Sequence, residues 1–247
     1  MILREPTVQL VAFTQFQTVP SIAWQTDSDR PAEQLVEFAG RMCYQSWNNP
    51  SGRTNQEYIT NLLRQGHLSV LEHAQASFAI SGISRSCSHE LVRHRHFSFS
   101  QMSQRYVAEE EANFVEPERI ANNPQAHAIF VAAVEKSREA YEELVKLLGE
   151  ELEGWPDRRE RRLIARQSAR AVLPNATETR LVMTGNFRAW RHFLRLRGSR
   201  AAEGEIRRLA LAIHRELVRL SPACFGDFQR VEQPDGVIEL VTSLTAD

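Results

Sequence analysis

The chain has few of the residues on which several common kinds of protein depend. Three cysteines are scattered through its 247 residues, Cys43, Cys87 and Cys224, and they form neither a disulfide framework nor a CxxC metal site. We expect them to be buried and to act as small apolar side chains. The only lysines are Lys136 and Lys146, both in one predicted long helix, which argues against Schiff-base chemistry and against a P-loop lysine.

The glycine motifs that bind phosphate in many nucleotide-binding proteins are also missing. No two of the 11 glycines are two residues apart, so there is no GxGxxG, and neither GxxxxGK[ST] nor GxSxG occurs. A bound dinucleotide would therefore have to be held by arginines, hydroxyls and helix N-termini.

Long apolar runs and a large net charge are absent as well. No run approaches the ~18 apolar residues that a membrane-spanning helix needs. The first residues, MILREPTVQLVAF, carry Arg4 and Glu5 and lack a small-residue cleavage site, so we expect a cytoplasmic protein without a membrane segment. A net charge of −1, with 42% hydrophobic and 25% charged residues, is typical of an ordinary globular protein and not of a nucleic-acid binder.

The remaining pattern predicts one helix-rich α/β (α+β) domain over residues 1–247, with a mixed sheet flanked by helices. Predicted strands cover 8–16, 76–84 and 178–184. Predicted helices cover 31–46, 54–66, 86–95, 124–152, 158–172, 186–197 and 202–220. Pro234-Asp235-Gly236 predicts the turn of a hairpin near the C-terminus.

Several single residues predict where these elements begin and end. Thr54 and Glu57 form a capping box, and Asn186 can cap the helix that follows it. Gly82 indicates a bulge or a close approach of two backbones, and Gly185 is expected to end its strand.

The stretch from Arg93 to Tyr106, RHRHFSFSQMSQRY, has the highest density of hydrogen-bond donors in the chain. Arg93, Arg95 and Arg105 supply planar cationic groups that suit phosphate and carboxylate, serine hydroxyls lie among them, and no acidic residue interrupts them. Because so many unpaired donors would be costly to bury, the stretch predicts a site for a polyanionic small molecule.

Other chemistry is less well supported. His89-Glu90 and His94 superficially suggest a zinc-binding HExxH motif, but the histidines are five residues apart and not four, so no metal site is predicted. A serine nucleophile at Ser98 or Ser103 is conceivable, although an anion-binding role needs no activation.

A second basic cluster follows Asn186, in the sequence NFRAWRHFLRLR. On a helix, Arg188, His192 and Arg195 share one face, which is either a ligand site or simply a solvated surface. Arg170 is a third candidate, and the run 158–162 is interpreted as a solvated helix start.

The first of these motifs resembles that of the flavin-dependent thymidylate synthases, RHRxxSxxxxSxR. Arg93, His94, Arg95, Ser98, Ser103 and Arg105 occupy its fixed positions. The segments 66–74, 83–95, 169–180, 185–197 and 205–210 are similar to that family too, so the resemblance spans most of the chain.

The resemblance implies conversion of dUMP to dTMP, with 5,10-methylenetetrahydrofolate as carbon donor and FAD, reduced by NADPH, as hydride donor. It also implies a homotetramer with active sites at subunit interfaces. The implied FAD contacts are Ser69, Arg93, His94, Arg95, Gln101, Asn186, Phe187, Arg188 and His192. The implied dUMP contacts are Glu90, Leu91, Val92, Arg93, Gln101, Met102, Ser103, Gln104, Arg105, Arg170 and Arg197. Arg197 would be the catalytic residue and would polarise the uracil ring.

The chain departs from many relatives at three positions. Gln101 stands where many have Glu, Glu90 where many have Gln, and Glu203 where many have Gln, which changes the electrostatics. Two other classes stay open on sequence grounds: a flavin- or nucleotide-binding module without catalysis, and an RNA-binding protein that uses the two arginine clusters.

Overall fold

The computed structural model describes residues 1–49 and 52–244, and its contacts divide the chain into two units. Unit 1 comprises Met1–Pro6, Ile80–Arg93 and Ser100–Leu181, and unit 2 comprises Thr7–Ala79, His94–Phe99 and Val182–Asp247. Each unit is thus assembled from segments far apart in the sequence. That 1–247 forms a single domain stays a prediction.

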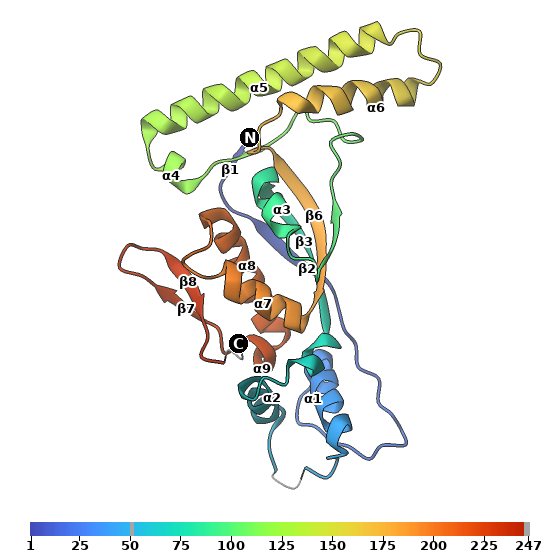
Figure 1. Cartoon of the computed structure of the whole chain (residues 1–247), viewed down its shortest axis with the longest axis vertical. Helices are drawn as coiled ribbons and strands as arrows, with labels where there is room; N and C mark the ends of the chain where they lie inside the picture. Colours follow the sequence, from blue (N-terminus) through green and yellow to red (C-terminus); the bar gives the residue numbers. More distant parts are fainter. Residues whose placement is uncertain (50–51, 245–247) are drawn as a thin grey trace. The chain divides into compact units, whose positions relative to one another are not determined.

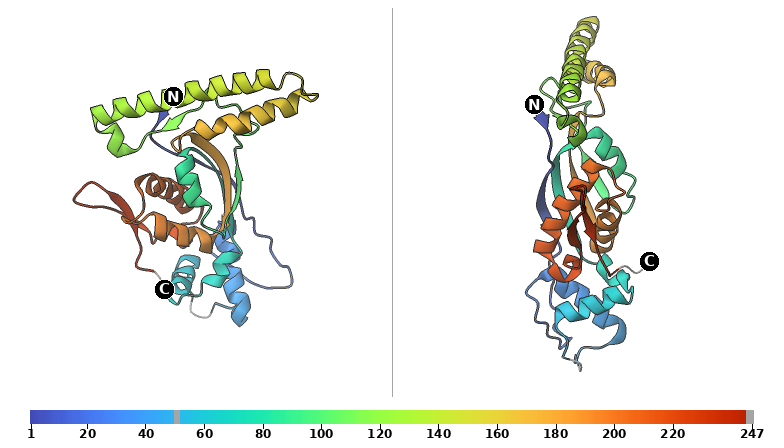
Figure 2. Two further views of the ribbon diagram at one scale, coloured as in Figure 1. Left: turned by 45° about the horizontal axis from the view of Figure 1, so that its top comes forward. Right: turned by 90° about the vertical axis from the view of Figure 1, so that its left-hand side faces the viewer.

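Unit 1 is dominated by two long helices. α5 (Pro124–Glu151) and α6 (Arg158–Ala169) pack along each other, as Figures 1 and 2 show from different sides. Asn123 caps α5 with its side-chain oxygen. Asp157 caps α6, where a carboxylate offsets the unfavourable effect of an arginine-rich first turn.

The rest of unit 1 packs short elements beside these helices. β1 (Ile2–Leu3) pairs in parallel with β5 (Phe114–Val115), so that Ile2 lies opposite Phe114. Phe114 belongs to an apolar cluster with Ala112 and Val134. α3 (Arg85–Leu91), α4 (Glu118–Ala121) and a 3-10 turn, η2 (Arg170–Val172), complete the unit.

Unit 2 holds the larger apolar core, formed mainly by helices. Its elements are α1 (Pro31–Tyr44), α2 (Asn55–Arg64), η1 (Leu68–Glu72), α7 (Phe187–Arg197), α8 (Gly204–Leu220), α9 (Pro222–Phe225) and the strands β7 (Gln229–Glu232) and β8 (Ile238–Val241). The predicted capping box of Thr54 and Glu57 is confirmed. The predicted C-terminal hairpin is confirmed as well, with Gln229 opposite Val241.

A four-stranded sheet has the order β2 (Thr7–Phe13), β3 (Gln75–Ser84), β6 (Glu178–Asn186) and β4 (Ser98–Gln101). Gly82 has φ +70° and a Cβ there would lie 2.7 Å from the carbonyl oxygen of Glu5, so the predicted close approach is confirmed. Contrary to the prediction, Gly185 lies inside β6 and does not end it. A Cβ at Gly185 would lie 2.4 Å from the ring of Phe97, so this position lacks a side chain because an aromatic ring lies against it.

Two further expectations were wrong. The helix predicted over 86–95 ends at Leu91. Arg93 lies in a turn and His94 outside regular structure, in the segment that leads to β4, a strand we did not predict. The chain leaves the helix here because Phe97 is packed against Trp190, with 4.5 Å between ring centroids. Cys43 is exposed, whereas Cys87 and Cys224 are buried as expected. The fold class itself, a helix-rich α+β protein, is confirmed. Among the described residues, no helix combines the length and apolarity needed to cross a bilayer.

Candidate active site

Helix α7 positions the second basic cluster of the sequence. Asn186 accepts a hydrogen bond from the amide of Ala189, which confirms the predicted N-cap. Trp190 and Phe193 are fully buried, and the indole N–H of Trp190 donates to the carbonyl oxygen of Ala76 at 3.2 Å. With one face of the helix fixed in the core, Arg188 and His192 lie on the outer face.

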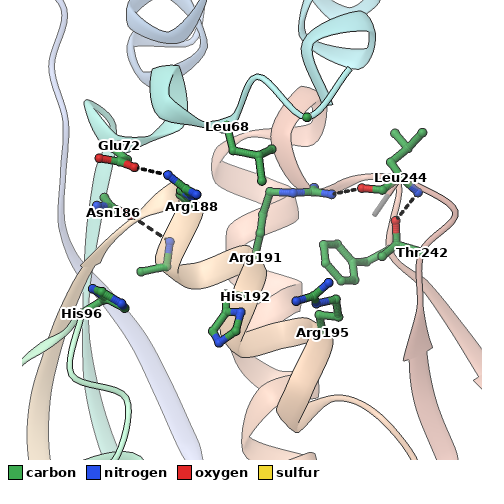
Figure 3. Close-up of a pocket in the computed structure, with 13 residues that line it drawn as sticks. Leu68, Glu72, His96, Asn186, Arg188, Arg191, His192, Arg195, Thr242 and Leu244 are labelled. Carbon is green, nitrogen blue, oxygen red and sulfur yellow. Dashed lines mark hydrogen bonds and ion pairs between the residues drawn. The ribbon is translucent and has the colours of Figure 1, made fainter. Parts of the chain in front are cut away.

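This outer face borders a pocket of about 560 Å³ that lies within unit 2 (Figure 3). The volume falls in the range of roughly 300–1,000 Å³ that is usual for small-molecule sites. Asn186, Arg188, His192 and Arg195 contribute polar groups, and apolar side chains come from Leu68, Phe228 and Leu244. The face predicted from helical spacing thus lines a pocket and is not merely solvated.

Within this pocket, Arg188 has an acidic neighbour. Its Nη1 donates to Oε1 of Glu72 at 2.5 Å, and both side chains are about half exposed (Figure 3). An exposed pair of this kind contributes little to stability, so the guanidinium can exchange this carboxylate for an anionic ligand at small cost.

Arg191 also lines the pocket and is held in place by several hydrogen bonds. Its two terminal nitrogens donate to the two carboxylate oxygens of Asp227 at 2.6 and 2.7 Å, and it also donates to the carbonyl oxygens of Cys224 and Leu244. Phe228 lies 4.8 Å from the guanidinium. Because the pair is nearly buried, it fixes α7 relative to α9 and the C-terminal segment of this unit.

Arg197, the predicted catalytic residue, lies in the last turn of α7. Its Nε donates to Nε2 of His94 at 2.9 Å. Burial, and then the charges of Arg197 and His192, lower the pKa of His94 to about 4. The pKa of His192 is also lowered, first by burial and then by Arg195, His96 and Arg188. Both imidazoles are therefore neutral at pH 7, in a neighbourhood whose positive charge comes from arginine.

In unit 1, Gln101 is held at the end of β4. Its amide nitrogen donates to the hydroxyls of Ser88 and Thr179, both at 3.0 Å. Both amide hydrogens are thus used within the protein, which fixes the orientation of the amide group.

The segment after Gln101 carries the predicted phosphate ligands. Gln104 is buried, and Arg105 is half-buried with its guanidinium 5.6 Å from the ring of Tyr106. Among the described residues, Nε of Arg105 is buried without a hydrogen-bond partner. An unsatisfied buried N–H on a cation indicates a place for an acceptor from a ligand.

A cluster of charged residues of unit 1 was missed by sequence reasoning. Burial lowers the pKa of Arg85, as does the nearby charge of Arg170, whereas Glu109 opposes the shift. Glu109 is only 2% exposed. Burial, with the charges of Glu178 and Glu110, raises the pKa of Glu109 to about 7, although Arg85 and a hydrogen bond from Gln104 act against the increase. Arg85 and Arg170 are both half-buried, and Glu109 offsets their positive charge only in part, so this cluster favours the binding of a dianion.

The predicted residues divide between the two units. Unit 2 contains His94, Arg95, Ser69, Asn186, Phe187, Arg188, His192 and Arg197. Unit 1 contains Glu90, Leu91, Val92, Arg93, the run 101–105 and Arg170. Asn186, Arg188 and His192 are brought together in the pocket, whereas Ser69 and Arg95 are exposed and do not line it. Phe187 and Leu91 are fully buried and expose no surface in this chain, so the structure does not support a direct ligand contact for either.

The sequence did not lead us to predict four of these residues as part of the site: Glu72, Arg85, Glu109 and Arg195. For Arg195 the signal was present, because it lies seven residues after Arg188 and three after His192. For Arg85 and Glu109 no local pattern exists, since their role depends on burial and on each other.

Fold and pocket together define a helix-rich α+β protein with an arginine-lined ligand site. The family model described as "Thymidylate synthase complementing protein" matches residues 26–223. The chain is 53% identical over 238 residues to a flavin-dependent thymidylate synthase of Mycolicibacterium gilvum, covering 96% of this chain and 94% of the relative. It is 53% identical over 240 residues to one of Mycobacteroides abscessus (96% and 95% covered) and 52% identical over 238 residues to one of Mycobacterium marinum (96% and 94% covered). The chain therefore belongs to the flavin-dependent thymidylate synthases and is an enzyme of that family.

Proposed function

We propose that this enzyme makes dTMP from dUMP by reductive methylation. The carbon comes from 5,10-methylenetetrahydrofolate, and two electrons come from NADPH through FAD. The products are dTMP, tetrahydrofolate and NADP⁺, so that carbon and electrons balance. The observation that carries the proposal is the pocket on α7, in which Asn186, Arg188, His192 and Arg195 converge in a chain that belongs to this family.

The donors of this pocket fit FAD. A dinucleotide has an anionic pyrophosphate and flat aromatic rings, and the pocket combines three arginines, Arg188, Arg191 and Arg195, with apolar walls from Leu68 and Phe228. We assign Ser69, Arg93, His94, Arg95, Gln101, Asn186, Phe187, Arg188 and His192 to FAD on the family resemblance, and we add Arg195 from the pocket. When bound, FAD supplies the hydride chemistry, and the protein supplies orientation and charge.

Unit 1 supplies the groups that suit dUMP. We assign Arg105, Ser103 and Arg170 to the phosphate, and Glu90, Leu91, Val92, Arg93, Gln101, Met102 and Gln104 to the rest of the nucleotide. Two observations support this assignment. Among the described residues, Nε of Arg105 is buried without a hydrogen-bond partner, and the charge of Arg170 acts on Arg85, so each place favours an anion.

Arg197 is assigned to the uracil ring as the catalytic residue. A fixed positive charge beside the ring stabilises negative charge that develops there as the N3 proton is lost, and this makes C5 more nucleophilic. No cysteine nucleophile is needed, since Cys224 is buried and Cys43 and Cys87 lie outside the pocket lining.

We further propose a cytoplasmic homotetramer with active sites at subunit interfaces. In support, Val11 and Phe13 of β2 are 56% and 41% exposed, and Ile129 of α5 is 72% exposed. Val11 and Phe13 are two residues apart on β2 and therefore share one face of the strand, and adjacent exposed apolar side chains are compatible with a surface that another subunit covers. Light scattering should give four times the 28.3 kDa chain mass, and a monomer at micromolar concentration would contradict the proposal.

The visible spectrum of the purified protein tests the proposal first. We expect a flavin spectrum that bleaches under anaerobic NADPH, with a rate that depends on dUMP. A yellow protein that never oxidises NADPH would instead be a flavin-binding module. A colourless protein that cannot be loaded with FAD, and that binds RNA with a steep salt dependence, would contradict the proposal entirely.

A further inference from the structure

The pocket on α7 contains a carboxylate at the place where an anion would bind. Glu72, the last residue of η1, accepts a hydrogen bond from Nη1 of Arg188 at 2.5 Å (Figure 3). Both side chains line the pocket, and Glu72 is the single acidic residue among the described residues of this lining. The same lining holds three arginines, Arg188, Arg191 and Arg195, so the carboxylate stands out against the charge around it.

The fold holds Glu72 and Arg188 beside each other. The amide of Phe187 donates to the carbonyl oxygen of Ala74 at 2.9 Å, which joins the first residue of α7 to the segment that follows η1. Val70 of η1 is buried, so this turn is anchored in the core of unit 2. Backbone bonding and packing therefore place a carboxylate next to this arginine.

The electrostatic effect of Glu72 on a ligand depends on the charge of each phosphate. Both side chains of the pair are about half exposed, so the pair adds little to stability and Arg188 can bind a phosphate as well. A phosphate at Arg188 would then be repelled by the charge of Glu72. At about 4 Å in water this repulsion corresponds to roughly five-fold in affinity for each negative charge.

Phosphates differ in this respect according to how they are substituted. A terminal phosphate carries about −1.5 to −2 at pH 7. A phosphate that is substituted on two sides, as both phosphates of a dinucleotide are, carries one negative charge. A carboxylate beside the arginine therefore penalises the terminal phosphate more than the phosphates of a dinucleotide.

We propose that Glu72 is a specificity residue of this pocket, which disfavours ligands with a terminal phosphate and thereby favours a dinucleotide. The inference rests on the proposed assignment of the pocket to FAD. Arg191 offers a contrast within the same helix, because its carboxylate partner, Asp227, is nearly buried and accepts hydrogen bonds from two of its nitrogens. That pair is structural, whereas the exposed pair of Glu72 and Arg188 lies where a ligand can meet both charges.

The main experiment compares two ligands that differ at the outer phosphate. ADP ends in a terminal phosphate, and in ADP-ribose the same phosphate is esterified and carries one charge. Each ligand is used to displace FAD from the loaded enzyme, and the released flavin is followed by its fluorescence. Glu72→Gln removes the charge and keeps the size of the side chain. It should lower the ratio of the ADP to the ADP-ribose dissociation constant about five-fold.

Glu216→Gln is the matched control for this substitution. Glu216 accepts a hydrogen bond from Arg219 at 2.8 Å in another ion pair of unit 2, outside the pocket lining, so its variant should keep the wild-type ratio. FAD itself should bind Glu72→Gln at least as tightly as the wild type. An unchanged ratio in Glu72→Gln would overturn the inference, and so would weaker binding of FAD, which would make the carboxylate a group that binds the dinucleotide.

Ionic strength gives a second readout. Because the pair is half exposed, salt should screen the repulsion, and the difference in ratio between wild type and Glu72→Gln should shrink between about 20 mM and 500 mM salt. A difference that does not depend on salt would show that the variant changes the shape of the pocket and not its charge, and this result would also overturn the inference.

The outcomes separate the inference from the assignment on which it rests. Arg188→Ala should weaken FAD binding. If it binds FAD as tightly as the wild type, the assignment of this pocket to FAD fails. If Arg188→Ala weakens FAD binding but Glu72→Gln keeps the wild-type ratio, only the role of Glu72 fails.

Discussion

The buried carboxyl group of Glu109 gives the sharpest prediction about stability and pH. Its side chain lies in unit 1 beside Arg85, with Oε1 unsatisfied among the described residues. Burial raises its pKa from 4.5 to about 7. A raised pKa means that the folded state binds the proton more tightly than the unfolded state, so stability falls as the pH rises above 4.5 and levels off above 7.

The size of the effect follows from these two values. For a single group with pKa 4.5 unfolded and about 7 folded, linkage gives a loss of about 2.5 kcal/mol in the free energy of unfolding between pH 5 and pH 8. Glu109→Gln cannot ionise and should lose this part of the pH dependence. The wild type should therefore lose about 2.5 kcal/mol more than the variant over this range.

Urea unfolding of the ligand-free protein at pH 5 and pH 8 measures the difference, provided that the m-value is unchanged. Glu111→Gln is the control, because Glu111 is an exposed glutamate two residues away and its variant should keep the wild-type pH dependence. If the curves of wild type and Glu109→Gln run parallel with pH, Glu109 is not the titrating group that we describe.

Three further predictions concern other residues. Asp227→Asn breaks a nearly buried ion pair, in which the side-chain exposures are 11% for Asp227 and 8% for Arg191, and it should lower the free energy of unfolding by about 3–5 kcal/mol. A loss below about 1 kcal/mol would contradict the anchoring role of Arg191. Arg105→Ala should weaken dUMP binding by about 2–3 kcal/mol in equilibrium titrations, since it removes a charge-assisted contact, and an unchanged dissociation constant would refute the phosphate assignment. Combined Cys43→Ser, Cys87→Ala and Cys224→Ala substitutions should leave dTMP formation intact, because burial raises the pKa of Cys224 to about 12 and no thiolate forms there. Complete loss of turnover with normal flavin and dUMP binding would show that a thiol takes part.

Local signals in the sequence predicted much of the fold. The capping box at Thr54, the N-cap at Asn186 and the turn before β8 each depend on residues within a few positions of one another, and the structure confirms all three. The amphipathic pattern of α7 likewise predicted which of its residues face outward. These features are local, so a single sequence contains the information for them.

What the sequence did not predict depends on contacts between distant segments. The helix after Ser84 ends at Leu91 because Phe97 is needed beside Trp190, and nothing near residue 91 indicates this. Glu109 lies in an acidic stretch that is typical of an exposed loop, yet it is buried. Arg191 looks like one more arginine of a basic helix until Asp227, 36 residues later, pairs with it.

The same distinction applies to the candidate site. The motif from Arg93 to Arg105 predicts an anionic ligand, since its residue types suit phosphate and carboxylate. It did not reveal that the motif contributes to both units, nor that His94 accepts a hydrogen bond from Arg197. The roles of individual residues thus required the structure.

The central claim is that this enzyme transfers reducing equivalents from a flavin into the new methyl group of dTMP. The most direct test reduces the FAD-loaded enzyme without oxygen, adds dUMP and methylenetetrahydrofolate, and measures flavin absorbance and dTMP in the same sample. We predict that the flavin becomes oxidised only when both substrates are present, with one dTMP formed per flavin oxidised. Flavin that stays reduced, or that is oxidised without dTMP, would contradict the account.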